Sequence, residues 1–152
     1  MNIISKNNIV SALLASICGI ITGHLFLMLY GVVFSYLVEI KAIEWTKNLP
    51  NSFNFISYWL YNFIVDSLVL AIVIIIVGCI IGAFVKINRI IASVISFVCF
   101  ELTIAFLNFK VANEFSLFIF SPISYHLLLS AIAICLFWGS FYLGGYVRNK
   151  IR

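Results

Sequence analysis

The sequence predicts an all-α membrane protein, a four-transmembrane-helix up-down bundle with both termini inside the cell (N-in/C-in). Three observations support this fold class: an extreme composition, four long apolar blocks and an uneven distribution of Lys and Arg. The 152 residues are 64% hydrophobic and 9% charged, with a mean hydropathy of +1.20. A soluble domain is about 45–50% apolar and about 25% charged. This chain has too few charges to cover a surface that faces water, so a membrane protein is the class that fits.

Four apolar blocks cover residues 9–38, 58–85, 90–109 and 123–147. An α-helix rises about 1.5 Å per residue, so about 20 residues cross a hydrocarbon core about 30 Å thick. Each block is long enough, and the first two are expected to tilt or to project beyond the bilayer. Barrel strands are excluded because the run 68–77 shows no alternation of polarity. We therefore predict a single integral membrane domain over residues 1–152.

The connections between the predicted helices are short. An outer loop covers about residues 39–57, and a second outer loop covers about residues 110–122, where Ser121-Pro122 is typical of a helix start. Residues 86–89 form a tight hairpin between the second and third helices. Charged and apolar residues alternate over 39–47, so this part of the first loop is expected to lie on the membrane surface.

The charges predict the orientation. Lys and Arg concentrate on the cytoplasmic side of membrane proteins. The basic residues on one side have no acidic residue among them, whereas Lys41, Lys47 and Lys110 on the other side are offset by acidic neighbours. The unbalanced set is Lys6, Lys86, Arg89, Arg148, Lys150 and Arg152. Both termini are therefore expected in the cytoplasm. The pI near 9.0 reflects this topology, since the basic residues are too dispersed for nucleic acid. A composition rich in Ile, Asn and Phe suggests an AT-rich bacterial genome, so a bacterial inner membrane is expected.

A few polar residues inside the predicted spans are candidates for a proton or ion pathway. They are Asp66, Glu101, His24, Asn62 and His126. A charge at the bilayer centre costs at least about 2.5 kcal/mol, so an intramembrane ionisable residue is a functional candidate by default. The alternative is structural, because polar residues in membrane helices commonly form interhelical hydrogen bonds worth about 0.6 kcal/mol each. The sequence leaves both interpretations open.

No catalytic or metal-binding pattern is assembled in the sequence. Asp66 is the only aspartate, whereas a membrane aspartyl protease needs two, and neither Glu-x-x-His nor His-Glu-x-x-His occurs. The four cysteines fall one in each predicted helix without a Cys-x-x-Cys pair, which favours packing over redox or metal chemistry. We therefore predict no catalytic residue, no metal and no cofactor, and we favour a non-enzymatic protein.

Small residues recur at every fourth position, a spacing that lets two helix backbones approach closely. The first helix carries the longest stripe, and shorter ones occur on the second and fourth helices. The predicted helix-packing residues are Ser11, Ala15, Gly19, Gly23, Gly78, Gly82, Gly139 and Gly144. On the fourth helix, Ala131 and Cys135 continue the row of Gly139. Contacts within the bundle are favoured over dimerisation, although the pattern itself does not specify the partner.

Two functional hypotheses follow. The first is a non-enzymatic accessory, assembly or immunity-type protein that recognises another membrane protein through its small-residue stripes and outer loops. The second is a small oligomeric permease that couples transport to protons or cations through Asp66 and Glu101. Four short helices rarely enclose a pathway alone, so transport implies self-association. The lipid bilayer is a partner in either case, and nucleic acid is not.

Overall fold

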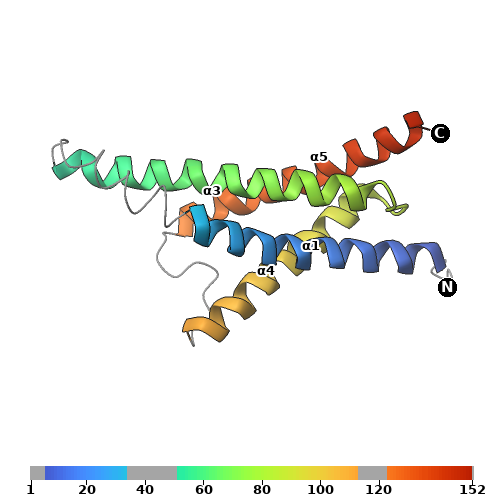
Figure 1. Ribbon diagram of the computed structural model, residues 1–152, viewed down its shortest axis with the longest axis horizontal. Coiled ribbons are helices and arrows are strands. Elements are labelled where there is room, and N and C mark those ends of the chain that lie inside the picture. Colours follow the sequence, from blue (N-terminus) through green and yellow to red (C-terminus); the bar gives the residue numbers. More distant parts are fainter. Residues whose placement is uncertain (1–5, 34–50, 113–122, 152) are drawn as a thin grey trace.

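The computed structural model describes residues 6–33, 51–112 and 123–151, and these residues form four long helices (Figure 1). Helix α1 spans Lys6–Val33, α3 spans Asn51–Gly82, α4 spans Arg89–Ala112 and α5 spans Ile123–Ile151. Each helix contains a stretch long and apolar enough to cross a membrane: Asn7–Val33, Asn62–Gly82, Arg89–Lys110 and Tyr125–Ile151. The described part of the chain is thus an all-helical membrane protein.

The helix ends differ from the predicted ones where polar residues flank an apolar block. Helix α3 begins at Asn51 rather than at residue 58, and α5 continues to Ile151 rather than ending at residue 147. A helix satisfies its own backbone hydrogen bonds, so it need not end where the apolar block ends. The end predicted for the first helix, most of the loop 39–57 and the Ser121-Pro122 helix start lie outside the described residues.

The bundle consists of two closely packed helix pairs. Helix α1 packs mainly against α4, and α3 packs mainly against α5, while α1–α3 and α4–α5 contacts join the two pairs. Within the described residues, α3 and α4 do not pack on each other although only residues 83–88 separate them, so they lie diagonally across the bundle. Successive helices alternate in direction, and both termini lie at the same end of the molecule (Figure 1).

Two glycines form the seam between α1 and α4. A Cβ at Gly19 would overlap the carbonyl oxygen of Ser96, and a Cβ at Gly23 would lie 2.9 Å from the Thr103 side chain. The close approach lets the Ser96 hydroxyl donate a hydrogen bond of 2.8 Å to the carbonyl of Ala15 on the other helix. Ala15 and Ser96 are both fully buried. The seam therefore combines tight backbone contact with a satisfied polar group.

The seam between α3 and α5 is built in the same way from three glycines. A Cβ at Gly82 would lie 2.6 Å from the Cα of Phe141, and a Cβ at Gly144 would overlap the carbonyl oxygen of Cys79. Gly78 faces α5 one turn before Gly82. Because lipid supplies no hydrophobic drive for helix association, such van der Waals contact is a main source of stability.

Aromatic side chains connect the pairs through the middle of the bundle. The ring of Phe26 on α1 lies 6.0 Å from that of Phe100 on α4, which in turn lies 6.1 Å from Phe137 on α5. Both contacts are edge-to-face, the arrangement that aromatic quadrupoles prefer. All three side chains are at most 2% exposed. They fill the space that the small residues of the seams leave between the pairs.

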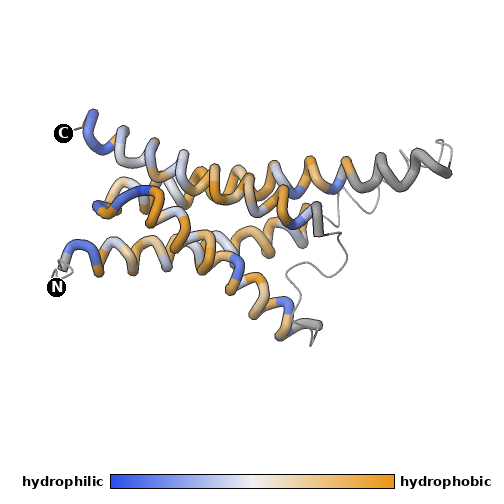
Figure 2. The backbone as a smooth tube through the Cα atoms, turned by 180° about the vertical axis from the view of Figure 1, so that it is seen from behind, coloured by the Kyte–Doolittle hydropathy of each residue, from blue (hydrophilic) through white to orange (hydrophobic). Residues whose placement is uncertain are grey.

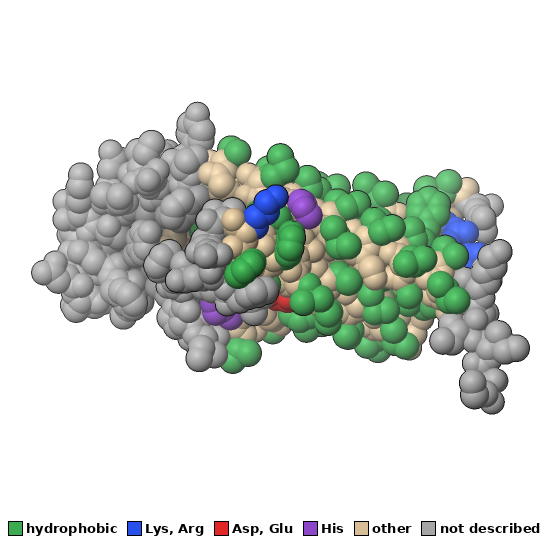
Figure 3. Space-filling model, turned by 90° about the horizontal axis from the view of Figure 1, so that it is seen from below, with side chains coloured by type: hydrophobic (Ala, Val, Ile, Leu, Met, Phe, Trp, Pro, Cys, Tyr) green, Lys and Arg blue, Asp and Glu red, His purple; other side chains and the backbone are tan. Residues whose placement is uncertain are grey.

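The outer surface is apolar over its middle and basic at the end that carries the termini. Large hydrophobic side chains are exposed on every helix, for example Met28, Leu68, Leu102 and Leu127. Figure 3 shows them covering most of the described surface on one face, and Figure 2 shows hydrophilic residues gathered near the two termini. Such a surface is stable in lipid, since there the exposed side chains meet hydrocarbon instead of water.

We predict that Gly19→Ala destabilises the bundle by about 1–3 kcal/mol, because the added methyl group forces the α1 and α4 backbones apart. Gly31→Ala is the matched control, since a Cβ at Gly31 on the same helix would meet nothing within 4 Å. Unfolding of both variants in detergent measures the difference. Equal stability of the two variants would contradict the close contact between α1 and α4 at Gly19.

Candidate functional site

Asp66 is the most deeply buried charged side chain in the described residues, with 4% of its surface exposed. The hydroxyl of Tyr125 on α5 donates a hydrogen bond to its Oδ2 atom. Tyr125 is itself 3% exposed, and its ring packs edge-to-face on Phe63 at 5.5 Å. A hydroxyl that donates to a carboxylate forms a charge-assisted hydrogen bond, so this contact offsets part of the cost of burying Asp66.

The pair lies near the end of the bundle opposite the termini. Tyr125 is the third residue of α5, so the contact lies about 3 Å from the start of that helix at 1.5 Å per residue. Asn62 lies one turn closer to that end, and its Oδ1 atom is shielded without a hydrogen-bond partner among the described residues. The His126 ring packs on that of Tyr125 with the centroids 6.2 Å apart. Asn62 and Asp66 therefore lie one turn apart on α3, with Tyr125 of α5 bonded to Asp66, and His126 is the next residue after Tyr125.

Glu101 occupies a different interface. The Ser130 hydroxyl on α5 donates a hydrogen bond of 3.2 Å to its Oε1 atom, which links α4 to α5 near the middle of the α4 span. Tyr125 and Ser130 are five residues apart on α5, which corresponds to about 140° of rotation about the helix axis. Asp66 and Glu101 thus approach α5 from separate sides, one from α3 and the other from α4.

His24 lies apart from these groups. It is exposed on α1, and its Nδ1 atom lies 3.0 Å from the carbonyl oxygen of Ile20 on the same helix. The imidazole therefore forms a hydrogen bond within its own helix, to a residue one turn earlier in the chain. Of the five predicted pathway residues, Asn62 and Asp66 lie one turn apart on α3, and His126 adjoins Tyr125, the partner of Asp66. His24 and Glu101 lie at other places.

The structure assembles no metal centre from the described residues. No group of three or more His, Cys, Asp or Glu side chains lies close enough together there to hold a metal ion. The four cysteines are free thiols at different depths: Cys18 is buried, Cys79 and Cys99 are half-buried, and Cys135 is exposed. They do not form a common site.

The predicted packing residues fall into two groups. Ser11, Ala15 and the glycines at 19, 23, 78, 82 and 144 are buried between helices. Gly139 differs, because a Cβ there would meet nothing within 4 Å. It lines an open groove of about 250 Å³ with Ile75 of α3 and Cys135, Leu136, Ser140 and Leu143 of α5. The small-residue row of α5 is therefore only partly used inside the bundle.

The residue that sequence reasoning missed is Tyr125. A Tyr at the start of an apolar block, as Tyr125 is at the start of the fourth, is typical of the aromatic belt at a membrane interface. Asp66 lies eight residues into the block 58–85 and Tyr125 two residues into the block 123–147, so the sequence alone places Asp66 deeper. The two residues are joined only by the packing of α3 against α5, which the sequence does not specify.

Comparisons of this chain with protein-family models, with curated proteins and with solved structures give no significant match.

We predict that Tyr125→Phe lowers the free energy of unfolding by about 0.6–1.7 kcal/mol, the range of interhelical hydrogen bonds in a membrane protein. Tyr142→Phe on the exposed side of α5 is the control and should have little effect. In an Asp66→Ala background, the Tyr125→Phe change should cost almost nothing, because its acceptor is gone. Unfolding in detergent measures all four variants, and an equal cost in both backgrounds would disprove the bond.

Proposed function

We propose that this protein is a non-enzymatic accessory, assembly or immunity-type protein of a bacterial inner membrane that recognises another membrane protein. The observation that carries the proposal is the open groove beside Gly139, between α3 and α5. Lipid supplies no hydrophobic drive for helix association, so recognition between membrane helices depends on close packing and on shared hydrogen bonds. A groove lined by a glycine is complementary in shape to a ridge of side chains on a partner helix.

The neighbours of Gly139 support a protein partner. Cys135 and Ala131 are exposed and continue its row, Cys135 one turn and Ala131 two turns earlier on α5. Larger apolar residues, Ile75 on α3 and Leu143 on α5, border the groove. The small residues allow a second helix backbone to approach, and the larger ones supply contact area on both sides. On α1, by contrast, Gly19 and Gly23 already pack against α4.

The buried carboxyl groups support a structural role within this proposal. Asp66 accepts a hydrogen bond from α5, and so does Glu101, but the two lie in separate interfaces. Both act as cross-links between helices, in keeping with the usual role of polar residues in membrane bundles.

The proposed orientation has both termini in the cytoplasm. Lys86, Arg89, Arg148 and Lys150 belong to the end of the bundle that carries the termini, and no acidic residue lies in residues 1–38, 67–100 or 115–152 of the sequence. This asymmetry is what the positive-inside rule describes for the cytoplasmic side of a membrane. The groove beside Gly139 would then lie within the hydrocarbon layer.

The alternative is a small oligomeric permease coupled to protons or cations through Asp66 and Glu101. The observation that favours it is the shielded Oδ1 atom of Asn62, one turn from Asp66, which has no hydrogen-bond partner among the described residues. An unsatisfied carbonyl oxygen beside a carboxyl group is suited to a proton-bearing or cationic ligand. A pathway would have to connect the α3–α5 interface with the α4–α5 interface, where Glu101 lies.

A filled groove tests the favoured function. We expect Gly139→Trp to lower recovery of a stoichiometric partner from native membranes in mild detergent by about tenfold or more, since overpacking costs about 1–3 kcal/mol. Gly31→Trp is the matched control, because Gly31 is equally open on another helix. Equal recovery of the partner with both variants would contradict recognition through this groove. So would a failure of the unmodified protein to co-purify with any partner.

Removal of the carboxyl groups tests the alternative. If the chain only cross-links its helices through these groups, Asp66→Asn and Glu101→Gln should leave partner recovery within about twofold of the unmodified protein. Proteoliposomes that contain a fluorescent pH indicator provide the second measurement. Proton flux that the unmodified chain supports and both variants abolish would favour the permease instead.

A further inference from the structure

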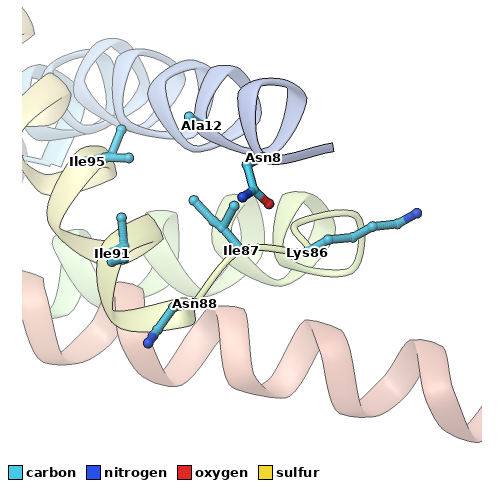
Figure 4. A pocket seen from close by; sticks show the side chains of 7 residues that line it. All are labelled: Asn8, Ala12, Lys86, Ile87, Asn88, Ile91 and Ile95. Atoms are coloured by element: carbon cyan, nitrogen blue, oxygen red, sulfur yellow. The ribbon is translucent and has the colours of Figure 1, made fainter. Parts of the chain in front are cut away.

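A second groove lies at the end of the bundle that carries the termini. It has a volume of about 560 Å³ and is formed between the start of α1, the start of α4 and the hairpin that precedes α4. Figure 4 shows the side chains that line it: Asn8, Ala12, Lys86, Ile87, Asn88, Ile91 and Ile95. The volume lies in the range of sites for small ligands, about 300–1,000 Å³.

The polarity of this groove changes along its length. Ile91 and Ile95 project from α4 at the deeper end, about 3–9 Å from the start of that helix at 1.5 Å per residue. Asn8 and Lys86 lie towards the outer end, and the Lys86 side chain extends away from the apolar walls (Figure 4). A ligand that fits must therefore be apolar at one end and polar at the other.

Two contacts hold the groove in shape. The backbone N–H of Lys86 donates a hydrogen bond of 3.0 Å to the Ser11 hydroxyl, which attaches the hairpin to α1. The Asn88 side chain accepts a hydrogen bond of 2.9 Å from the backbone N–H of the second residue of α4 and so caps that helix. The walls are thus positioned by the fold itself, before any ligand is present.

The charge at the outer end of the groove is positive, and no carboxyl group of the described residues compensates it. Arg89 stacks on the Tyr142 ring at 4.8 Å, and Arg148 donates a hydrogen bond of 2.8 Å to the carbonyl of Ala83, so both guanidinium groups contact other parts of the bundle. Lys86 instead is exposed. The two carboxyl groups in the described residues, Asp66 and Glu101, are held between helices elsewhere.

We infer that this groove binds an anionic phospholipid. The phosphate-bearing headgroup would contact the Lys86 ammonium and the Asn8 amide at the outer end, while an acyl chain would lie along Ile91 and Ile95. Charge complementarity and the order of polar and apolar walls favour a lipid over a protein segment, because both match a molecule that stands upright in the membrane. Basic pockets between transmembrane helices are known to bind lipid headgroups in this way. The inference does not depend on the proposed function.

Native mass spectrometry of the full-length protein in detergent tests the inference. The probes are phosphatidylglycerol, phosphatidylcholine with the same acyl chains, and inorganic phosphate. We expect one phosphatidylglycerol to be retained preferentially, and Lys86→Gln to weaken its retention about fivefold, as expected for one basic residue at a membrane surface. Lys150→Gln, an equal loss of charge at the same end but outside the groove, should have little effect.

A second pair of variants tests the apolar wall. Ile91→Trp fills the groove, whereas Ile90→Trp places the same residue on the neighbouring exposed position outside it. We expect only the first to reduce phosphatidylglycerol retention. Equal effects of Lys86→Gln and Lys150→Gln, or equal retention of the two lipids, would overturn the inference by showing unspecific attraction. Competition by inorganic phosphate at the concentration of the lipid would overturn it in favour of a free anion. If Ile91→Trp does not fold, the phosphatidylglycerol retention of Lys86→Gln, compared with that of Lys150→Gln, decides the inference.

Discussion

The bundle depends on the close approach of helix backbones at two glycine seams. In lipid, an apolar side chain gains little by leaving its surroundings for the interior of a bundle, so association relies on van der Waals contact and hydrogen bonds between helices. Both require short distances. At Gly19 and at Gly144 the neighbouring backbone occupies the space where a Cβ would be. These contacts pair α1 with α4 and α3 with α5, and every other feature of the fold is arranged around the two pairs.

The seams also decide where the polar groups meet. Once α3 lies on α5, the Asp66 carboxyl reaches the Tyr125 hydroxyl, and once α4 lies beside α5, the Glu101 carboxyl reaches Ser130. Helix α5 therefore supplies the hydroxyl group for both acids, although it contributes no acid itself. These two contacts give both buried acids a hydrogen-bond donor. Two grooves on the outside of the bundle are open to other molecules, one between α3 and α5 and one between the starts of α1 and α4.

These two grooves differ in the polarity of their lining residues, and each lining suits a different proposed ligand. The one beside Gly139 is lined mainly by apolar and small residues, a surface suited to another helix. The one beside Lys86 passes from isoleucine walls to amide and ammonium groups over a few turns, a gradient that resembles the membrane interface itself. Protein recognition and lipid binding would thus occupy different surfaces of one small bundle.

The sequence by itself determined the class of protein and the number of spans, because lipid demands about 20 apolar residues per span. It also indicated the glycine stripes. It did not determine which stripe meets which helix, since the small-residue spacing is the same on α1, α3 and α5 and carries no information about its partner. Only the tertiary structure placed α3 and α4 diagonally, joined Asp66 to Tyr125, and separated Asp66 from Glu101. It also left Gly139 open while burying Gly144 five residues later, because about 140° of helix rotation turns one glycine towards the groove and the other towards α3.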